Sequence, residues 1–405
     1  MQAAASSPVR GFRDAAAVRI PRLDPLMLVA TLGIIGASLY TLGTATQDDV
    51  PGSPNYFVYR QLAYAGVGLL LMLLIARFDY SRLREWKLGL YAFAIASILM
   101  VYVLGYSARG SRRAIELPFF NFQASELGKL LLAVTLAAFM VDRLRRLQGH
   151  ETTSRITLLA LVPAMLVIAQ PDLGSGLVYL AILVAVLFVA GTSWSHFAGL
   201  AGLAALAIVL TLVAAPAVGV ELLKPYQKDR LTAFLDPSSN PGGRGYQINQ
   251  SLTAIGSGGK TGRGDDATQT RLDFLPEHRT DFIFSVVGEE FGFVGAALVL
   301  SLFALLIWRA LRVLTMSKNF YGALVAGGIT AMLMFQVFVN VGMTVGIMPI
   351  TGIPLPLMSY GGSSVLTTLM AIGVLQSIHA QAREIAAGKQ SAHGRPNRPF
   401  AAGGL

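Results

Sequence analysis

The sequence predicts an all-α polytopic membrane protein with about ten transmembrane helices and one long extracytoplasmic loop. Hydrophobic residues make up 54% of the 405 positions and charged residues only 13%, with a mean hydropathy of +0.59. A soluble domain carries about 25% charged residues, so this chain is too apolar to be one. The apolar residues also form runs of about 20, the length of a helix that crosses a bilayer. The chain has no cysteine, which excludes disulfides and thiolate metal sites.

Ten apolar runs are candidate spans. The fifth and sixth are separated only by a short "QPDLG" stretch, so the count can differ by one or two. An even count places both termini on the same side of the membrane. The candidate spans cover residues 25–44, 58–77, 86–106, 125–142, 155–171, 174–191, 196–217, 281–307, 321–346 and 359–381.

The distribution of Lys and Arg predicts the orientation. These residues are concentrated before the first span and in the second, fourth and eighth loops, whereas the first loop has none before Arg60. Because basic short loops stay in the cytoplasm, both termini are predicted to be cytoplasmic. The third loop is the exception, with Arg109, Arg112 and Arg113 on the predicted outer side. The net charge of +10 is mostly this positive-inside excess, so nucleic acid is not an expected partner.

The spans divide the chain into five segments. The N-terminus lacks an apolar signal-peptide core, so the first span is expected to act as an uncleaved signal. Both tails are rich in Ala, Gly, Pro and charge, which is typical of disorder. In the outer loop, "YQINQSLTAI" (246–255) has the apolar spacing of a short amphipathic helix. The segments are a cytoplasmic tail (1–24), helices one to seven (25–217), the extracytoplasmic loop (218–280), helices eight to ten (281–382) and a cytoplasmic tail (383–405).

The stretch "AIGSGGKTGRG" (254–264) resembles the end of a phosphate-binding P-loop. Ala254 occupies the first glycine position, however, and no strand is predicted before it. The predicted topology also places the stretch outside the cell, where ATP is absent. We therefore expect a flexible glycine-rich turn, in which Lys260 and Arg263 are available to touch glycan or lipid phosphates.

Ionisable groups at membrane depth are functional candidates. In "FNFQASELGKLLL", Glu126 and Lys129 share one helix face and form either a site or a structural ion pair that orients two helices. The preceding "ARGSRR" cluster contains Arg109, Arg112 and Arg113. One guanidinium group can donate two parallel hydrogen bonds to a phosphate, so these arginines suit a pyrophosphate head group. Snorkelling onto anionic lipid is the alternative for them.

Among these motifs, the run "LDFLPEHRTDFIFSVVGEE" (272–290) points most strongly to a catalytic site. Asp281 stands where the long loop re-enters the bilayer, beside basic neighbours, and suits a general base. In the alternative interpretation, Thr280 or Asp281 merely caps the helix. A lone histidine such as His278 is more often a hydrogen-bonding loop residue than a ligand, and no metal-ligand spacing accompanies it.

Three further features lie at membrane depth. Asp172, in "QPDLGSG", is either a site residue or a helix cap. Glu289 and Glu290 lie about two turns inside the eighth span and need partners. The stretch "VNVGMTVGIMPITGIPLPLMSYGGSS" (339–364) breaks the ninth-to-tenth span region with Gly and Pro. Broken backbone at this depth must be buried in protein or line a cavity, so we expect a loop that dips into a central cavity.

Taken in order, these motifs resemble the SEDS family of integral membrane proteins, the RodA and FtsW group. The resemblance covers roughly residues 25–382, and the spelling "LPEHRTDFIF" is more similar to RodA than to FtsW. It rests on the motifs "GSRRAIELPFFNFQASELGK", "QPDLGSG", "RLTAFLDPSSNPGGRGYQINQSLTAIGSGG", "LPEHRTDFIF" and "GIMPITGIPLPLMSYGGSS".

The resemblance implies a ten-span peptidoglycan glycosyltransferase of the bacterial cytoplasmic membrane that serves cell-wall elongation and cell shape. Such an enzyme polymerises lipid II at the outer face, with a class B penicillin-binding protein as the transpeptidase that crosslinks the nascent glycan strand. Membrane lipids are its other expected partners. A divalent cation, Mg²⁺ or Mn²⁺, is the one cofactor left open, and no metal ligand is assigned.

The resemblance also implies residue roles. Asp281 matches the essential aspartate of the T-D-F motif and is the predicted catalytic residue. Two departures from the family pattern are Ala114, where Trp is usual, and Ala124, where Pro is usual. The predicted substrate-binding residues are Arg109, Arg112, Arg113, Gln123, Glu126, Lys129, Asp172, His278 and Ser359.

The expected mechanism is an inverting transfer. Asp281 removes a proton from the 4-hydroxyl of the acceptor sugar or positions it, and that oxygen attacks the anomeric carbon of the donor. A β-1,4 linkage forms and undecaprenyl pyrophosphate leaves, stabilised by Arg112, Arg113, Lys129 or a divalent ion. Two alternatives remain: a lipid II flippase or transporter, which broken helices also fit, and a non-catalytic scaffold that activates a transpeptidase.

Overall fold

The computed structural model describes residues 23–108, 111–117, 120–143, 150–217, 227, 230, 232–234, 243–272 and 274–393. Among these residues, nine helices are long and apolar enough to cross a membrane, and α6 is a shorter apolar helix. The prediction of about ten transmembrane helices is therefore confirmed. These ten helices are α1 (Pro25–Ala45), α2 (Tyr56–Arg77), α3 (Lys87–Leu104), α4 (Ala124–Val141), α5 (His150–Ala169), α6 (Leu173–Val189), α7 (Trp194–Val209), whose span continues to Ala217, α12 (Ile283–Met316), α13 (Phe320–Thr344) and α14 (Gly362–His393).

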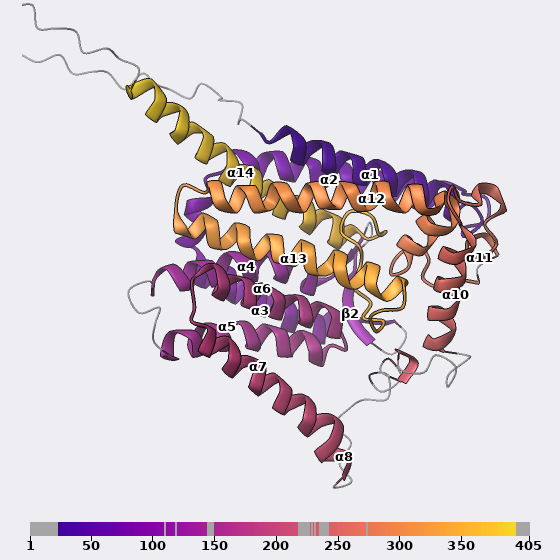
Figure 1. Ribbon diagram of the computed structural model, residues 1–405, viewed down its shortest axis with the longest axis horizontal. Coiled ribbons are helices and arrows are strands. Elements are labelled where there is room, and N and C mark those ends of the chain that lie inside the picture. Colours follow the sequence, from indigo (N-terminus) through magenta and orange to yellow (C-terminus); the bar gives the residue numbers. More distant parts are fainter. Residues whose placement is uncertain are drawn as a thin grey trace, which may run out of the picture.

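The helices run side by side as a bundle whose two ends differ (Figure 1). We call the end that carries α10 and α11 the loop end, and the end with the start of α1 and the end of α14 the terminal end. The short elements are η1 (Tyr80–Arg84), β1 (Tyr106–Ala108), β2 (Ser111–Glu116), β3 (Asn121–Phe122), η3 (Leu210–Ala214), α8 (Ala215–Ala217), α10 (Arg244–Ser257), η5 (Gly264–Asp266) and α11 (Thr268–Arg271).

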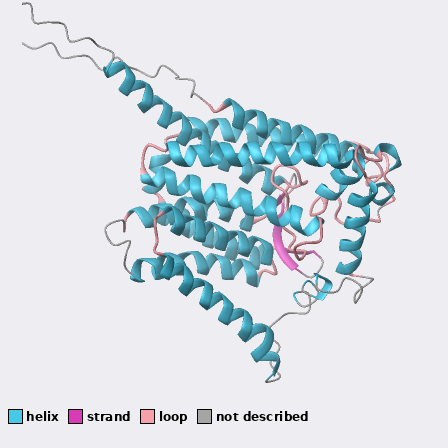
Figure 2. Cartoon of the chain, in the orientation of Figure 1, coloured by secondary structure: helices cyan, strands magenta, loops and turns pink. Residues whose placement is uncertain are grey.

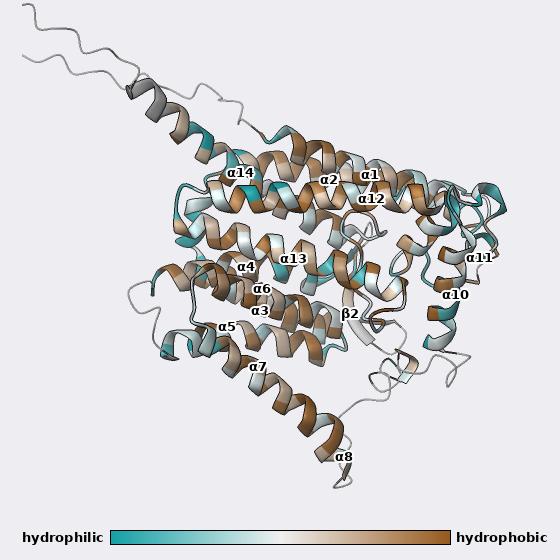
Figure 3. Ribbon diagram, in the orientation of Figure 1, coloured by the Kyte–Doolittle hydropathy of each residue, from teal (hydrophilic) through white to brown (hydrophobic). Residues whose placement is uncertain are grey.

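Helices α4, α13 and α14 form the centre of the bundle. In their most apolar stretches, 83%, 72% and 89% of the residues are buried, whereas in the stretch that α7, η3 and α8 form together only His196 and Ala215 are buried. That stretch diverges from the bundle (Figure 1) and is almost uniformly hydrophobic (Figure 3). The apolar surface of the central helices is thus covered by protein, and that of the outer helices is left for the bilayer.

A small sheet at the loop end was not predicted. Strands β1, β2 and β3 pair antiparallel in that order, with Tyr106 opposite Ala114 and Ile115 opposite Phe122. Strand structure is drawn in magenta in Figure 2. β1 and β3 have only three and two residues, and the six residues of β2, "SRRAIE", do not alternate between apolar and polar, so no period-two pattern predicts them. The sheet joins α3 to α4, and β2 contacts both of these helices.

The C-terminal tail corrects one expectation. Residues 383–405 were predicted to be disordered, but α14 continues to His393. The segment "REIAAGKQ" is dominated by strong helix formers, and their propensity extends the last span beyond its apolar part. The predicted tail before residue 23 lies outside the described residues. The amphipathic helix predicted over 246–255 is confirmed as α10.

Close packing of α4 against α6 depends on a glycine. A Cβ atom at Gly128 would lie 2.0 Å from the hydroxyl of Tyr179, which is fully buried. That hydroxyl donates to the carbonyl of Ser125, 3.1 Å away. A methyl group at residue 128 would therefore displace a hydrogen bond as well as a side chain.

We expect Gly128→Ala to destabilise the protein by about 1–3 kcal/mol, the usual cost of overpacking a core. Thermal unfolding in detergent measures this effect. Gly66→Ala is the matched control, because a Cβ there meets nothing within 4 Å. Equal unfolding temperatures for the two variants would contradict the proposed close contact.

Candidate active site

A pocket of about 400 Å³ lies at the loop end. Its walls come from the starts of α2, α4, α6 and α14, from the sheet, and from the two irregular segments before α12 and before α14. It brings together three predicted site residues, Gln123, Asp172 and Asp281. The lining residues are Arg60, Tyr64, Ala114, Asn121, Gln123, Asp172, Thr280, Asp281, Gly352, Pro354, Tyr360, Gly361, Gly362, Ser363 and Ser364.

Asp281 lies in the turn that precedes α12. The N-cap of this helix is Phe282, and no side-chain hydrogen bond caps it, so neither Thr280 nor Asp281 acts as the cap. The backbone carbonyl of Asp281 accepts a hydrogen bond from Nδ2 of Asn340, 2.9 Å away. The capping interpretation is therefore wrong, and the carboxylate of Asp281 lines the pocket instead.

The loop between α13 and α14 approaches Asp281 closely. A Cβ atom at Gly352 would lie 3.4 Å from Oδ2 of Asp281, and Gly352 has a positive φ of 75°. The positive φ favours glycine, and the distance of 3.4 Å corresponds to ordinary van der Waals contact. The loop does line a cavity at its Gly352 turn, as the broken 339–364 stretch predicted.

Arg230 is a pocket neighbour that the sequence analysis did not single out. Its side chain is 5% exposed, and its Nη1 donates to the carbonyl of Thr351 over 2.9 Å. Its Nη2 lies 3.8 Å from the Cβ position of Gly352, the same position that Asp281 approaches. A buried cation and the predicted catalytic carboxylate therefore flank one glycine. Its place in the quoted motif "RLTAFLDPSSNPGG" was the available signal.

Asp172 serves as a cap and as a pocket residue at once. Its Oδ1 accepts from the backbone N–H of Ser175 at 3.1 Å, which caps α6. Its Oδ2 accepts from Oγ of Ser125 at 2.8 Å and from Nε2 of Gln123 at 3.1 Å. The carboxylate thus ties the start of α4 to the start of α6. The helix-cap interpretation of Asp172 is confirmed, and its role as a substrate-binding residue stays a prediction.

Glu126 and Lys129 form a buried ion pair within α4. Nζ of Lys129 lies 2.6 Å from Oε1 of Glu126, and both side chains are at most 3% exposed. Neither residue lines the pocket. Since both partners belong to one helix, the pair does not itself bridge two helices.

Ser359 and His278 lie behind the pocket wall. Oγ of Ser359 donates to the carbonyl of Thr280 at 2.6 Å and accepts from the N–H of Leu355 at 2.8 Å. His278 is buried, with Nδ1 3.2 Å from the carbonyl of Leu275, so the loop hydrogen-bonding interpretation describes it well. Both residues fix the segment that carries Asp281, and neither is a pocket-lining residue.

Asp49 anchors the same segment from the first loop. Its Oδ2 lies 3.4 Å from Nε2 of His278 and 2.5 Å from Nη1 of Arg279. The guanidinium of Arg279 also lies over the ring of Phe57, 4.4 Å from its centre. A carboxylate, an imidazole and an aromatic face therefore hold the turn before Asp281.

The predicted arginine cluster is only partly within the described residues. Arg109 lies outside them. Arg112 and Arg113 belong to β2, which pairs with β1, and the next residue, Ala114, lines the pocket. The backbone of β2 therefore reaches the pocket at Ala114, and the contribution of Arg112 and Arg113 to substrate binding stays a prediction.

Glu289 and Glu290 both accept hydrogen bonds, although Oε1 of Glu290 is buried with no hydrogen-bond partner among the described residues. Glu289 accepts from the N–H groups of Gln269 and Thr270, at 2.8 and 3.0 Å, and from Oγ1 of Thr270 at 2.7 Å. Glu290 accepts from Oγ1 of Thr44 at 2.5 Å. These bonds fasten the outer loop and α1 to the first turns of α12.

In the described part of the chain, no group of three or more His, Cys, Asp or Glu side chains is arranged to hold a metal ion. The pocket has two carboxylates, Asp172 and Asp281. A divalent cation at the site therefore stays a prediction.

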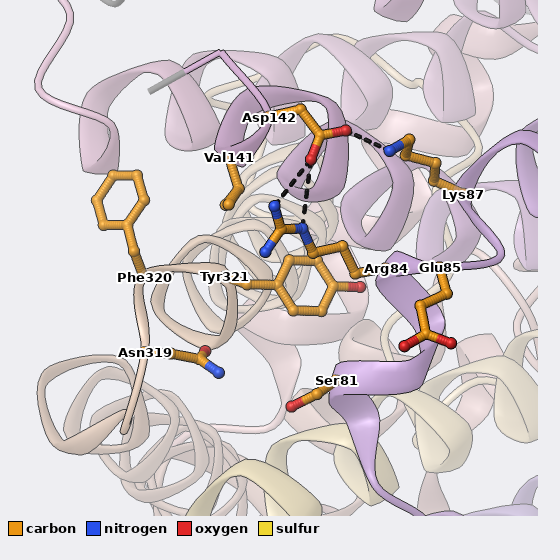
Figure 4. A pocket seen from close by; sticks show the side chains of 9 residues that line it. All are labelled: Ser81, Arg84, Glu85, Lys87, Val141, Asp142, Asn319, Phe320 and Tyr321. Carbon is orange, nitrogen blue, oxygen red and sulfur yellow. Dashed lines mark hydrogen bonds and ion pairs between the residues drawn. The ribbon is translucent and has the colours of Figure 1, made fainter. Parts of the chain in front are cut away.

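A second pocket, of about 520 Å³, lies at the terminal end (Figure 4). Asp142 accepts from Nη2 of Arg84 at 2.9 Å and pairs with Lys87. Burial raises the pKa of Asp142, but hydrogen bonds and charge from Lys87 and Arg84 outweigh it, so the pKa lies below its usual range. Glu85 also lines this pocket, which balances two cations with two anions. It offers no excess charge for an anionic substrate.

The chain is similar to known proteins over most of its length. Residues 23–384 match the FTSW_RODA_SPOVE family, described as "Cell cycle protein". Stage V sporulation protein E of Bacillus subtilis strain 168 is 36% identical, with 88% of this chain and 95% of that protein covered. The peptidoglycan glycosyltransferase MrdB of Escherichia coli K12 is also 36% identical, with 88% and 93% covered.

Solved structures agree with these sequence matches. The rod shape determining protein RodA of Thermus thermophilus is 30% identical, with a TM-score of 0.63 over 89% of this chain and 98% of that chain. A chain in a structure titled "Structural coordination of polymerization and crosslinking by a peptidoglycan synthase complex" is 33% identical. Its TM-score is 0.73, over 89% of this chain and 98% of that chain.

Removal of the Ser359 hydroxyl tests the pocket geometry. We expect Ser359→Ala to lower the stability by about 1–3 kcal/mol, because two buried backbone groups lose their partner. Ser364→Ala is the control, because its buried Oγ has no hydrogen-bond partner among the described residues. Thermal unfolding measures both, and a Ser359→Ala protein as stable as Ser364→Ala would contradict the geometry.

Proposed function

The chain belongs to the FtsW, RodA and SpoVE family, and from this premise we propose how its pocket carries out sugar transfer. The chain is a peptidoglycan glycosyltransferase, as relatives at 36% identity over most of its length are named. The observation that supports the assignment of the site is the position of Asp281. Its carboxylate lines the pocket without capping α12, beside a buried arginine.

The proposed substrate is lipid II, a disaccharide joined through pyrophosphate to a polyprenyl chain. Asp281 accepts the proton of the acceptor 4-hydroxyl as that oxygen bonds to the anomeric carbon of the donor. The bond from this carbon to the pyrophosphate oxygen breaks on the opposite face, so the configuration inverts from α to β. Undecaprenyl pyrophosphate leaves with the bonding electron pair. Positioned general bases contribute about 10²–10⁴-fold.

Two cations near the pocket support the proposed departure of the pyrophosphate. Arg230 is buried beside Gly352, and Arg60 lines the pocket. Negative charge grows on the pyrophosphate as its bond to the sugar breaks, and fixed cations stabilise that charge best where water is excluded. We assign Arg230 to this stabilisation or to the alignment of Asp281, since its Nη2 and Oδ2 of Asp281 both approach Gly352.

We further propose that the loop end faces outward and that both termini are cytoplasmic. The basic residues Arg77, Arg82 and Arg84 lie in or beside the turn between α2 and α3 at the terminal end, which fits the positive-inside rule. A class B penicillin-binding protein is the proposed partner, because the matched peptidoglycan synthase complex is described as coordinating polymerization and crosslinking. The motif spelling supports a role in elongation.

Asp281→Asn tests the catalytic assignment. The variant keeps the size of the side chain but does not accept the proton, so we expect at least about 10²-fold less glycan polymer. Polymer length and yield are measured with purified protein, its transpeptidase partner and lipid II in detergent. Asp266→Asn, on the exposed surface of the same outer loop, is the control. Undiminished polymer from Asp281→Asn would overturn the assignment, and lipid movement without polymer would favour a flippase.

Arg230 is expected to act mainly on turnover. We expect Arg230→Gln to lower kcat by about 10²-fold, in the range found when one charge-stabilising donor is removed. Arg230→Lys should recover only part of this loss, because a lysine lacks the forked donor geometry. Steady-state polymerisation assays give kcat and KM. A glutamine variant that changes only KM would contradict this role.

A further inference from the structure

Helix α12 is broken one-third of the way along its length. Gly292 has φ 63° and ψ −158°, a backbone conformation that is essentially restricted to glycine. Before the break, all residues from Ile283 to Glu290 are buried. After it, Phe293 and Val294 are 72% and 61% exposed. The break therefore separates a buried first segment, which follows directly after Asp281, from a membrane-facing span.

The backbone bonds lost at the break are replaced by the glycine segment, which we define as residues 258–263. In a continuous helix, the N–H groups of Phe293 and Val294 would bond to carbonyls four residues earlier. Here Phe293 donates to the carbonyl of Gly259 at 3.0 Å, and Val294 donates to the carbonyl of Lys260 at 3.1 Å. The freed carbonyl of Glu289 accepts from the N–H of Arg263 at 2.9 Å.

The glycines of this segment permit contact of backbone with backbone. A Cβ at Gly258 would lie 1.9 Å from the carbonyl oxygen of Gly288, and one at Gly262 would lie 2.1 Å from that of Glu290. A Cβ at Gly292 would lie 2.3 Å from the backbone nitrogen of Gly262. The P-loop-like spelling is thus explained by the approach of another backbone, and phosphate binding is not needed to account for it.

We propose that the glycine segment positions Asp281 by fixing the angle of α12 at Gly292. This inference rests on the proposed function, because it concerns the same carboxylate. Ile283 lies nine residues before Gly292, about 14 Å along a helix axis. A rotation of about 4° at the break would move the start of α12 by about 1 Å, and a misplacement of this size costs about 10²-fold in rate.

Other contacts hold the first segment of α12 against its neighbours. Oγ of Ser285 lies 2.6 Å from Oγ of Ser251 on α10, which donates to the carbonyl of Thr344 at 2.7 Å. Glu289 holds the backbone of Thr270, as described above. These bonds limit translation of the segment, while among the described residues only the glycine segment forms backbone hydrogen bonds to both sides of the break. Its residues are therefore positioning residues, and none touches the pocket.

Substitutions at Gly259 test the backbone requirement. This residue has φ +55°, and a Cβ there meets nothing within 4 Å, so only its backbone conformation restricts the side chain. Asn adopts positive φ readily and Val does not. We expect Gly259→Val to lower kcat by about 10- to 100-fold with an unchanged KM for lipid II. Gly259→Asn should stay within about twofold of the parent, as should Gly256→Ala, where space is open and φ is not positive. Equal kcat for the Val and Asn variants would overturn the proposal.

A crosslink tests the contact independently of stability. The chain has no cysteine, so Lys260→Cys with Val294→Cys creates a single pair at the hydrogen-bonded site. We expect rapid disulfide formation and at least half of the parent polymerisation rate in the crosslinked protein. Lys260→Cys with Trp308→Cys, about 21 Å further along the helix, should not crosslink. No crosslink at Val294, or a crosslinked protein whose activity returns only on reduction, would overturn the proposal.

The crosslink yield is measured without lipid II, so it is independent of the role of Asp281. If Asp281→Asn still polymerises lipid II while the crosslink forms at Val294, the general-base assignment fails and the contact stands. If Asp281→Asn is inactive and the crosslink does not form, the positioning role of the glycine segment fails and the catalytic assignment stands.

Discussion

One buried amide holds the two irregular segments of the site together. Nδ2 of Asn340 donates to the carbonyl of Asp281 at 2.9 Å and to that of Ile353 at 2.8 Å. Inside a membrane protein, a backbone carbonyl outside a helix needs a partner within the protein. The fully buried side chain of Asn340 is the hydrogen-bond donor to a carbonyl in each segment. The turn before α12 and the loop before α14 therefore meet at the pocket. The approach of Asp281 to Gly352 depends on this junction.

The same constraint explains why the site lies where helices begin or break. Asp172 caps α6 and binds Ser125, which joins two helix starts, and the glycine segment supplies partners at the break in α12. Side chains and loops that satisfy the backbone at these places also fix the pocket walls. Polar side chains and backbone groups that stabilise the fold, such as those of Asp172, therefore surround the proposed catalytic carboxylate of Asp281.

The sequence predicts some of these features and not others. Spans are local signals, so their number and approximate limits follow from apolar runs, and Asp281 follows from a motif at the end of one run. Arg230 becomes a neighbour of Asp281 only because the outer loop folds back, and no local pattern encodes that approach. Gly292 lies in the stretch "EEFGFVG", and no sequence pattern there distinguishes a helix break from a glycine that a continuous helix tolerates. The alternative interpretation, in which Thr280 or Asp281 caps the helix, is wrong, and the turn is held instead by Asn340 and Ser359 from distant segments.

The central claim is that Asp281 meets the acceptor hydroxyl in this pocket. An experimentally determined structure with an acceptor sugar and an unreactive donor analogue bound tests it most directly. The account predicts an acceptor 4-hydroxyl oxygen about 2.6–3.2 Å from a carboxylate oxygen of Asp281, the reach of a general base. An acceptor hydroxyl bound to Asp172, with Asp281 out of reach even through one water molecule, would contradict it.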